Sequence, residues 1–240
     1  MVIARKIAYN VVVSSVSKIL STILALVAIG LITRYLGQGG FGDYATVLAF
    51  LSLFSAIADL GINTTSTREI SRAGANEEYI VGNVFSFRLV VSLAVLFLSP
   101  AIVWFFPYTV QIKEAIIIVA FSFLFSSSYQ TLNGVFQKNL AMDKVAFSEL
   151  LCKLLQVGLV FLAIKLNLGF LWIVSALFFS MLSNFVWVYF WSRKYILFKL
   201  RFDFGYWKTF FKESYPVGLA VLITFIYFKL DTILLSVMRS

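Results

Sequence analysis

The stretch RYLGQGGFGDYATVLAFLSLFSAIADLGINTTSTREISR, residues 34–72, decides the fold. Its apolar run, residues 45–62, has about the length that an α-helix needs to cross a bilayer. The glycines between residues 37 and 42 predict a turn before this run, because glycine adopts conformations that interrupt a helix. Gly61 predicts the end of the run, and a charged segment follows it. The stretch therefore predicts one helical hairpin inside a protein with several membrane spans.

The composition indicates that the whole chain lies in a membrane. Of its 240 residues, 61% are hydrophobic and 13% are charged, and the mean hydropathy is +0.93. A soluble domain has about 45–50% apolar and about 25% charged residues, so a water-soluble core could not hide this much apolar surface. The chain has no histidine and only one cysteine, Cys152, which excludes an internal disulfide and removes the commonest metal ligand. We expect no cofactor and no bound metal.

Seven apolar segments are long enough to span a bilayer. They are residues 9–33, 43–63, 80–104, 114–136, 145–165, 168–191 and 213–237. The first segment is longer than the roughly 7–15 apolar residues of a signal peptide and lacks a cleavage site, so we expect a retained helix. The predicted fold class is an all-α polytopic membrane protein.

Basic residues gather in alternate loops. Twelve lie at the N-terminus and in the second, fourth and sixth loops, namely Arg5, Lys6, Arg68, Arg72, Lys138, Lys144, Arg193, Lys194, Lys199, Arg201, Lys208 and Lys212. Three lie in the other loops, namely Arg34, Lys113 and Lys165. The positive-inside rule therefore predicts a multi-pass protein with a cytoplasmic N-terminus. We expect the membrane to be the plasma (inner) membrane. Because this topology accounts for the net charge of +9, we expect no nucleic-acid partner.

The longest and most basic loop, residues 192–212, divides the chain. We expect residues 1–191 to form an N-terminal six-helix transmembrane lobe, and residues 192–212 to form a basic cytoplasmic loop. Residues 213–240 then form a seventh transmembrane helix, with Pro216 in its first turn, where proline is tolerated. A seventh helix without a partner predicts the start of a missing second lobe, so we expect the sequence to be the front part of a longer protein.

Charged residues inside the predicted spans are candidate site residues. A Lys, Arg or Asp at the centre of a membrane helix costs about 2.5–3.5 kcal/mol, so such groups face the bundle interior or a wet cavity. Lys18, Arg88 and Lys153 together predict a cationic cavity suited to an anionic head group, such as a phosphate or pyrophosphate. Gln130 and Asn133 belong to the longest polar row, in the fourth span, and are expected to contact the same substrate.

Structural explanations of the same residues stay open. Rows of polar side chains also hold membrane helices together. Glu149 and Lys153 are four residues apart and can pair on one helix face. Arg88 lies shallow enough to extend to the cytoplasmic surface, and Asp59 can cap the next segment or pair with Arg68.

The sequence lacks the motifs of nucleotide-dependent or hydrolytic chemistry. It contains no phosphate-binding P-loop, no dinucleotide fingerprint and no zinc-protease motif. A catalytic triad would need a histidine or a substitute base, and none is in place. We therefore expect neither an ATP-driven pump in this stretch nor an enzyme.

Two groups of residues carry a family resemblance. The first group is Arg34, Tyr35, Leu36, Gly37, Gly40, Phe41, Gly42, Tyr44, Asp59, Leu60, Gly61, Arg68, Glu69 and Arg72. The second group is Glu213, Ser214, Pro216, Gly218, Asp231, Thr232, Ile233 and Leu234. With these residues the chain resembles the polysaccharide transporter family, the Wzx-type flippases of lipid-linked oligosaccharides. The family's superfamily includes the multidrug and toxin extrusion (MATE) transporters, so the resemblance implies a MATE-like six-helix lobe plus a seventh helix.

The resemblance implies a function and a set of roles. The function is a flippase that moves lipid-pyrophosphate-linked oligosaccharide from the cytoplasmic to the outer leaflet by alternating access, for surface polysaccharide biosynthesis. Its partners would be that substrate, membrane lipids, and a polysaccharide polymerase or glycosyltransferases. Lys18, Arg88 and Lys153 would contact the head group. The residues implied in coupling or gating are Asp59, Arg68, Glu149 and Asp231.

Three other functions stay open. A cation-coupled drug or metabolite antiporter of the same superfamily would have an acidic rather than a basic cavity. A membrane-embedded sugar or acyl transferase would need an acid or a histidine in a loop near the membrane surface. A non-transporting assembly subunit is favoured only by the short length.

Overall fold

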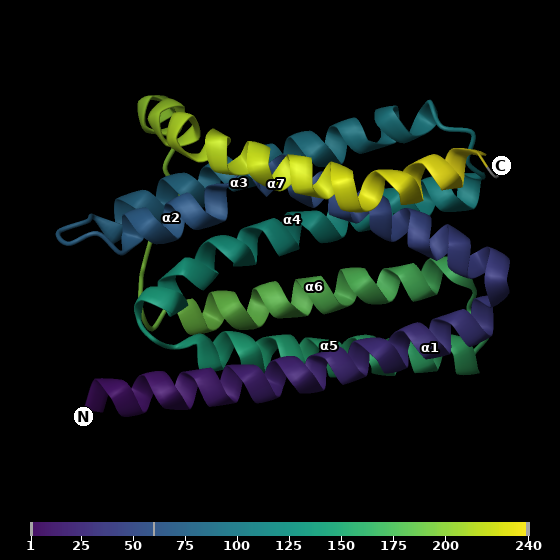
Figure 1. The fold of residues 1–240 in the computed structure, drawn as a ribbon, viewed down its shortest axis with the longest axis horizontal. Coiled ribbons are helices and arrows are strands. Elements are labelled where there is room, and N and C mark those ends of the chain that lie inside the picture. Colours follow the sequence, from purple (N-terminus) through teal and green to yellow (C-terminus); the bar gives the residue numbers. More distant parts are fainter. Residues whose placement is uncertain (1, 60, 239–240) are drawn as a thin grey trace.

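The computed structural model describes residues 2–59 and 61–238, without the side chains of residues 2–4, 6, 57, 221–222, 225–226 and 228–238. Within these ranges the chain forms helices and no strands. The helices are α1 (Val2–Asp59), α2 (Ile62–Ile70), α3 (Glu77–Trp104), α4 (Val110–Lys138), α5 (Met142–Lys165), α6 (Phe170–Ser192) and α7 (Phe204–Met238). The long helices run side by side along the longest axis of the molecule (Figure 1).

Helix α1 contains the predicted hairpin, but the hairpin has no loop. Only Gly37 leaves the helical conformation, at φ 68° and ψ −173°. Gly39, Gly40 and Gly42 continue the helix, so the expected flexible glycine turn is wrong in its extent. Figure 1 shows α1 reach one end of the bundle, turn a corner and return. A residue with a Cβ strongly disfavours this backbone conformation, so the corner depends on glycine.

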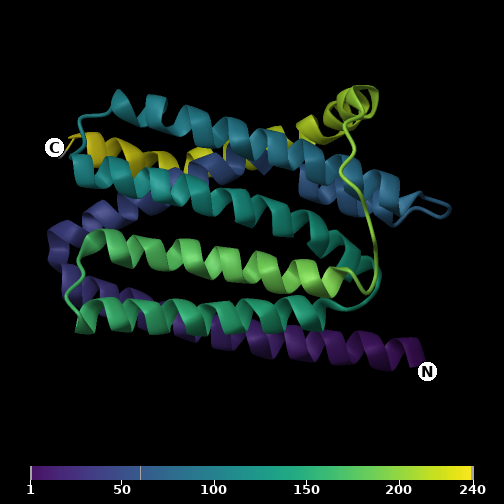
Figure 2. The ribbon, with the colours of Figure 1, turned by 180° about the vertical axis from the view of Figure 1, so that it is seen from behind.

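The turns of the bundle gather at two ends. The N-terminus, α2, the α4–α5 turn and the α6–α7 connection lie at one end, and the α3–α4 and α5–α6 turns lie at the other (Figures 1 and 2). The first end carries the loops that are rich in Lys and Arg. The structure therefore groups the charged loops as the positive-inside argument requires, while the side of the membrane that they face stays a prediction.

Five helices of the described chain are long and apolar enough to cross a membrane: one within residues 7–56, together with α3, α4, α5 and α6. Helix α1 accounts for two of the predicted spans, because its two arms run in opposite directions (Figure 2). The expected all-α polytopic membrane fold is confirmed.

Two apolar clusters hold the helices together. One lies around the corner of α1 and the α3–α4 turn and includes Ile32, Phe50 and Ile116. The other lies at the opposite end, where Ile70, from α2, and Phe210, from α7, pack with side chains of α3 and α4. The long outer surfaces of α1, α3 and α5 remain apolar and exposed, as expected for helices surrounded by lipid.

Two helix boundaries differ from those expected. Helix α1 ends at Asp59, and Gly61, in the left-handed region at φ 77°, separates it from α2. Helix α7 begins at Phe204, nine residues before the predicted start at Glu213, so only residues 193–203 connect α6 to α7 without a helix. Pro216 lies inside α7 rather than in its first turn. Figure 1 shows α7 bend after its first turns, as a proline inside a helix causes.

Candidate functional site

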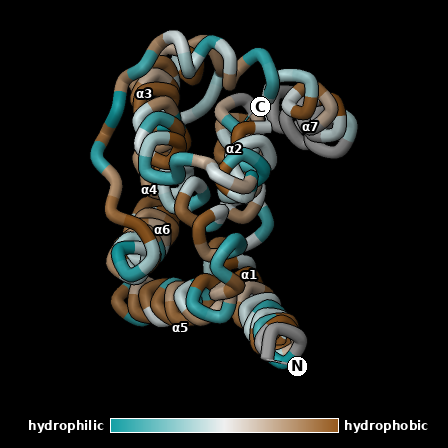
Figure 3. Tube along the Cα trace, turned by 90° about the vertical axis from the view of Figure 1, so that its left-hand side faces the viewer, coloured by the Kyte–Doolittle hydropathy of each residue, from teal (hydrophilic) through white to brown (hydrophobic). Residues whose placement is uncertain are grey.

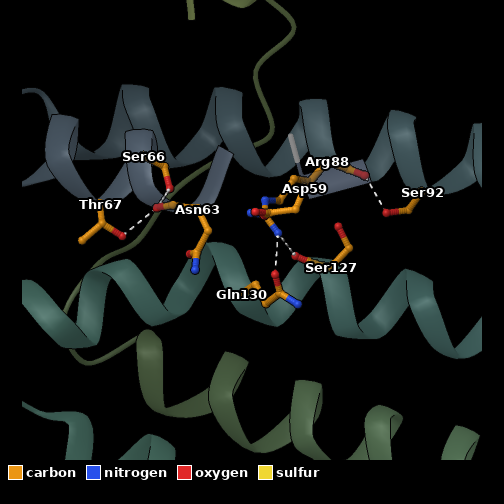
Figure 4. Close-up of polar contacts among 8 residues, drawn as sticks. All are labelled: Asp59, Asn63, Ser66, Thr67, Arg88, Ser92, Ser127 and Gln130. Atoms are coloured by element: carbon orange, nitrogen blue, oxygen red, sulfur yellow. Dashed lines mark hydrogen bonds and ion pairs between the residues drawn. The ribbon is translucent and has the colours of Figure 1, made fainter. Parts of the chain in front are cut away.

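Arg88 of α3 is at the centre of a buried polar cluster (Figure 4). Its side chain is almost fully buried, with 2% exposed, and its Nη2 lies 2.6 Å from the Asp59 carboxylate at the end of α1. Nη1 donates two hydrogen bonds to α4, to the carbonyl of Ser127 and to Oε1 of Gln130, each at 3.2 Å. Ser92 donates to the Arg88 carbonyl one turn along α3. One guanidinium thus joins α1, α3 and α4.

The Arg88–Asp59 pair answers one question that the sequence left open. Asp59 neither caps α2 nor pairs with Arg68; it neutralises Arg88. Arg68 instead lies 3.3 Å from Glu213 of α7, and both of these side chains are largely exposed. The Nε of Arg88 is buried and has no hydrogen-bond partner among the described residues. Arg88 is therefore a neutralised structural centre, and it does not join Lys18 and Lys153 in one cationic hollow.

A separate cavity of about 180 Å³ lies between α1, α4, α5 and α6. Eight of its eleven lining residues have polar or charged side chains, although most of its wall surface is apolar; the lining comprises Ser21, Ser126, Tyr129, Glu149, Cys152, Lys153, Gln156, Leu177, Ser180, Met181 and Asn184. Along α5 the lining residues lie between Val145 of one apolar cluster and Val160 of the other. The cavity therefore interrupts the apolar core at mid-bundle, where charged side chains that line a hollow are expected to have a functional role.

The charges near the cavity come from two helices. Lys153 and Glu149 of α5 both line it. Lys18 of α1 is exposed, and it lies close enough to Glu149 to attract the carboxylate electrostatically. The ion pair that the sequence left open between Glu149 and Lys153 does not form between these described side chains; the Lys153 ammonium donates instead to Oε1 of Gln156 at 2.9 Å. The carboxylate of Glu149 thus faces two ammonium groups without contacting Lys153.

The remaining predicted site residues fall in different places. Gln130 contacts Arg88 and does not line the cavity, contrary to the expected shared substrate site. Asn133 lies one turn further along α4, and its buried Oδ1 finds no hydrogen-bond partner in the part of the chain that the structure describes. Asp231 lies outside the described side chains. The structure therefore brings Lys153 and Glu149 to one cavity, with Lys18 beside them, and places Arg88, Asp59 and Gln130 in a second cluster.

The connection between α6 and α7, residues 193–203, is a fixed strap, which sequence reasoning missed. The backbone N–H of Arg201 donates to Oγ of Ser86 at 3.1 Å, and that of Asp203 donates to Oδ1 of Asn83 at 3.0 Å. The indole N–H of Trp207 donates to the Asn83 carbonyl at 3.1 Å. The strap is thus fastened along the first turns of α3.

The end of the strap is held by a carboxylate outside the membrane spans. Asp203 accepts hydrogen bonds from the hydroxyl of Tyr79 and from the backbone N–H of Tyr206. These two bonds, the first being the stronger cause, hold the pKa of Asp203 below its ordinary value. The sequence signal for this contact is the group Gly82, Asn83 and Ser86 at the start of an apolar span. Glycine lets another backbone approach closely, and the two polar side chains need hydrogen-bond partners when buried.

Helix α7 is also fastened to the junction of α1 and α2. The hydroxyl of Tyr206 donates to the carboxylate of Glu69 in α2. A Cβ at Gly61 would lie 2.5 Å from the Ser214 carbonyl oxygen and 2.8 Å from Cβ of Val217, so the backbones of the junction and α7 touch there. Two segments that carry the family resemblance, residues 59–72 and residues 213–218, are therefore neighbours in space.

Comparisons with known proteins identify the family. The family described as "Polysaccharide biosynthesis protein" matches residues 7–240. Searches of curated proteins and of solved structures gave no significant match. The match and the apolar helices together describe a multi-pass membrane protein, and they support a role in polysaccharide or oligosaccharide transport. The chain belongs to the family of polysaccharide biosynthesis proteins.

Proposed function

We propose that the chain contributes to a flippase that moves a lipid-pyrophosphate-linked oligosaccharide between the leaflets of the plasma (inner) membrane. The observation that carries this proposal is a mid-bundle cavity whose lining includes charged and polar side chains, in a chain that belongs to the polysaccharide biosynthesis family. An anionic head group needs such a site, because crossing hydrocarbon without polar partners is prohibitively costly.

Lys18 and Lys153 are the proposed contacts of the head group. Lys153 lines the cavity, and Lys18 is exposed beside it on α1. Ammonium groups bind phosphate oxygens through charge-assisted hydrogen bonds, and they are free to swing on long stems as a substrate passes. Lys153 now donates to Gln156, a neutral partner that a phosphate would displace.

Glu149 is the proposed coupling group. Its carboxylate lies among the cavity's lining and is attracted by both ammonium groups. When a phosphorylated head group occupies those ammonium groups, the carboxylate loses its compensation, which favours its protonation. Substrate binding and proton uptake would then be linked in one cavity.

The Arg88–Asp59 pair is proposed to act in gating. This role replaces the head-group contact that the sequence led us to expect for Arg88. It ties α1 to α3 and α4 through one guanidinium. A change in the angle of α1 must either carry this pair along or break it. Because breaking a buried pair is costly, the pair favours one arrangement of these helices.

The proposal is tested by neutralising the cavity's lysines in cells that depend on the full-length protein for surface polysaccharide. Lys18→Ala and Lys153→Ala are each expected to lower export by about tenfold or more, since a hydrogen bond to a charged group contributes about 1.5–3 kcal/mol. Lys153→Arg is expected to retain most export, because it keeps the charge.

The matched control is Lys165→Ala, which removes an exposed lysine at the other end of the same helix. Membrane levels of all variants are measured by immunoblotting. Parental export from both alanine variants at normal protein levels would overturn the head-group role. Loss of export in the control as well would show that the assay reports overall charge rather than the cavity.

A further inference from the structure

The strap and the first turns of α7 present an exposed surface that is both basic and aromatic. We infer that this surface, residues 193–212, binds the anionic head groups of the phospholipid leaflet that surrounds it. The inference goes beyond the proposed transport function, because it concerns a lipid that is a partner and not the cargo. We call these residues the strap surface.

The strap surface exposes basic and apolar side chains together. Exposed basic side chains of the strap surface are Arg193, Lys194, Lys199, Arg201, Lys208 and Lys212. Its exposed apolar side chains are Leu197 at 63%, Leu200 at 50%, Phe202 at 54%, Phe204 at 73% and Phe211 at 40%. Figure 3 shows hydrophilic and hydrophobic stretches alternate along this connection.

Neither bulk water nor hydrocarbon suits such a surface. Large apolar side chains exposed together to water mark an interaction site. Six cations in the hydrocarbon core would each cost several kcal/mol. The interface between head groups and acyl chains accommodates both, because aromatic and aliphatic groups enter the leaflet while Lys and Arg stems extend to the phosphates.

The first turns of α7 have one buried face and one exposed face. Trp207, Phe210 and Ser214 are buried, and they recur at the spacing of one helix face. Phe204, Lys208, Phe211 and Lys212 are exposed and recur at the same spacing on another face. The exposed face of this segment therefore carries aromatic rings and ammonium groups together, as in helices that lie in a membrane interface.

The strap surface combines a charge complementary to anionic head groups with a fixed backbone. Asp203 is the acid of the strap surface, and it is occupied by Tyr79 and by the N–H of Tyr206. The strap backbone is hydrogen-bonded to Asn83 and Ser86, so the basic side chains project from a preformed support. The strap directly follows α6, a helix long enough to span the membrane, which places it at the membrane boundary.

The test measures lipid selectivity of the purified full chain. The protein is held in micelles with equal amounts of phosphatidylglycerol and phosphatidylcholine, and bound lipids are counted by native mass spectrometry. The parent is expected to retain phosphatidylglycerol preferentially. In the triple variant K199Q/K208Q/K212Q, affinity for phosphatidylglycerol is expected to fall by about fivefold per charge, on the order of a hundredfold in total.

The matched control is R34Q/K113Q/K165Q, which removes the same number of charges from the turns at the other end of the bundle. It is expected to keep the parental selectivity. All three lysines of the test variant are exposed, so helical content measured by circular dichroism should not change. Equal loss in both triple variants, or parental selectivity in the test variant, would overturn the inference.

Two further arms separate an interface from a simple anion site. Phe204→Ser is expected to weaken retention of both lipids alike, because it removes an apolar anchor without changing charge. Inorganic phosphate at the lipid's concentration is expected to displace little phosphatidylglycerol. Full displacement by phosphate, with no effect of Phe204→Ser, would show a binding site for free anions and would contradict an interfacial lipid site.

Discussion

Arg88 shows how one buried cation can be stable in a membrane bundle. The two Nη groups of its guanidinium are paired with the Asp59 carboxylate and with two acceptors on α4, and the buried charge does not face lipid. A pair of this kind contributes little net stability when whole, but leaves an uncompensated charge when one partner is removed. Arg88 therefore contributes more to the choice of one helix arrangement than to the net stability of the bundle.

Asp59→Asn is expected to destabilise the protein by about 3–5 kcal/mol, because Arg88 would remain buried without its counter-charge. Thermal unfolding of the purified protein in detergent measures the loss. Asp43→Asn is the control, since Asp43 is exposed on the same helix. The double variant Asp59→Asn/Arg88→Gln should recover part of the stability. An Asp59→Asn variant as stable as the parent would contradict the structural role of the pair.

Gly82 marks the place where the strap touches α3. A Cβ there would lie 2.3 Å from the Lys199 carbonyl oxygen, which belongs to the backbone and cannot turn away. Gly82→Ala is therefore expected to lift the strap and to cost about 1–3 kcal/mol, as other overpacked sites do. Hydrogen exchange of residues 199–203 measures the release.

The comparison variant is Gly158→Ala in α5. A Cβ at this position meets no atom within 4 Å, so no clash arises. Alanine has a higher helix propensity than glycine, and this variant should be neutral or slightly stabilising. Faster exchange of the strap in the Gly158 variant would mean that the effect of Gly82→Ala is not local.

At the scale of elements, the strap is expected to respond to pH through Asp203. Hydrogen bonds from Tyr79 and the Tyr206 N–H lower its pKa in the folded protein. The stabilisation is therefore fully present above the ordinary pKa of 3.8, and it is lost as the pH falls through the lower, folded value. Hydrogen exchange of residues 201–206 should stay slow at neutral pH and rise only in strong acid.

Asp203→Asn provides the control for this pH response. The amide cannot lose a proton, so exchange of the same residues should be faster at neutral pH and should no longer change in acid. A pH response that persists in this variant would assign the effect to another group.

Most elements could be predicted from the sequence, because apolar runs of about twenty residues have few alternatives in a bilayer. The boundaries that failed depended on context. Gly39, Gly40 and Gly42 continue α1 although glycine disfavours helices, since the chain needs only one residue to turn. Phe204 begins α7 early because Trp207 and Phe210 find buried partners that no periodicity rule anticipates.

At the scale of the whole molecule, the site was predicted only in part. Depth in a span predicted that Lys18, Arg88 and Lys153 avoid lipid; in the structure Arg88 is buried and Lys153 lines a cavity, whereas Lys18 is exposed and is not among the cavity's lining residues. Depth alone could not show that a carboxylate neutralises Arg88 but not Lys153. The pairing of Arg88 with Asp59 depends on how α1, α3 and α4 meet. The family resemblance was confirmed by the match over residues 7–240.

Because the corner of α1 consists of Gly37 alone, it fixes how the second arm is rotated about its own axis. One added residue in the helix that follows advances its phase by about 100°, because an α-helix has 3.6 residues per turn. Tyr44, Val47 and Phe50, now buried, would then rotate toward lipid. The rotation of the second arm about its own axis is therefore fixed relative to the first arm. The number of residues between Gly37 and Tyr44 is as strict a requirement as the identity of any side chain.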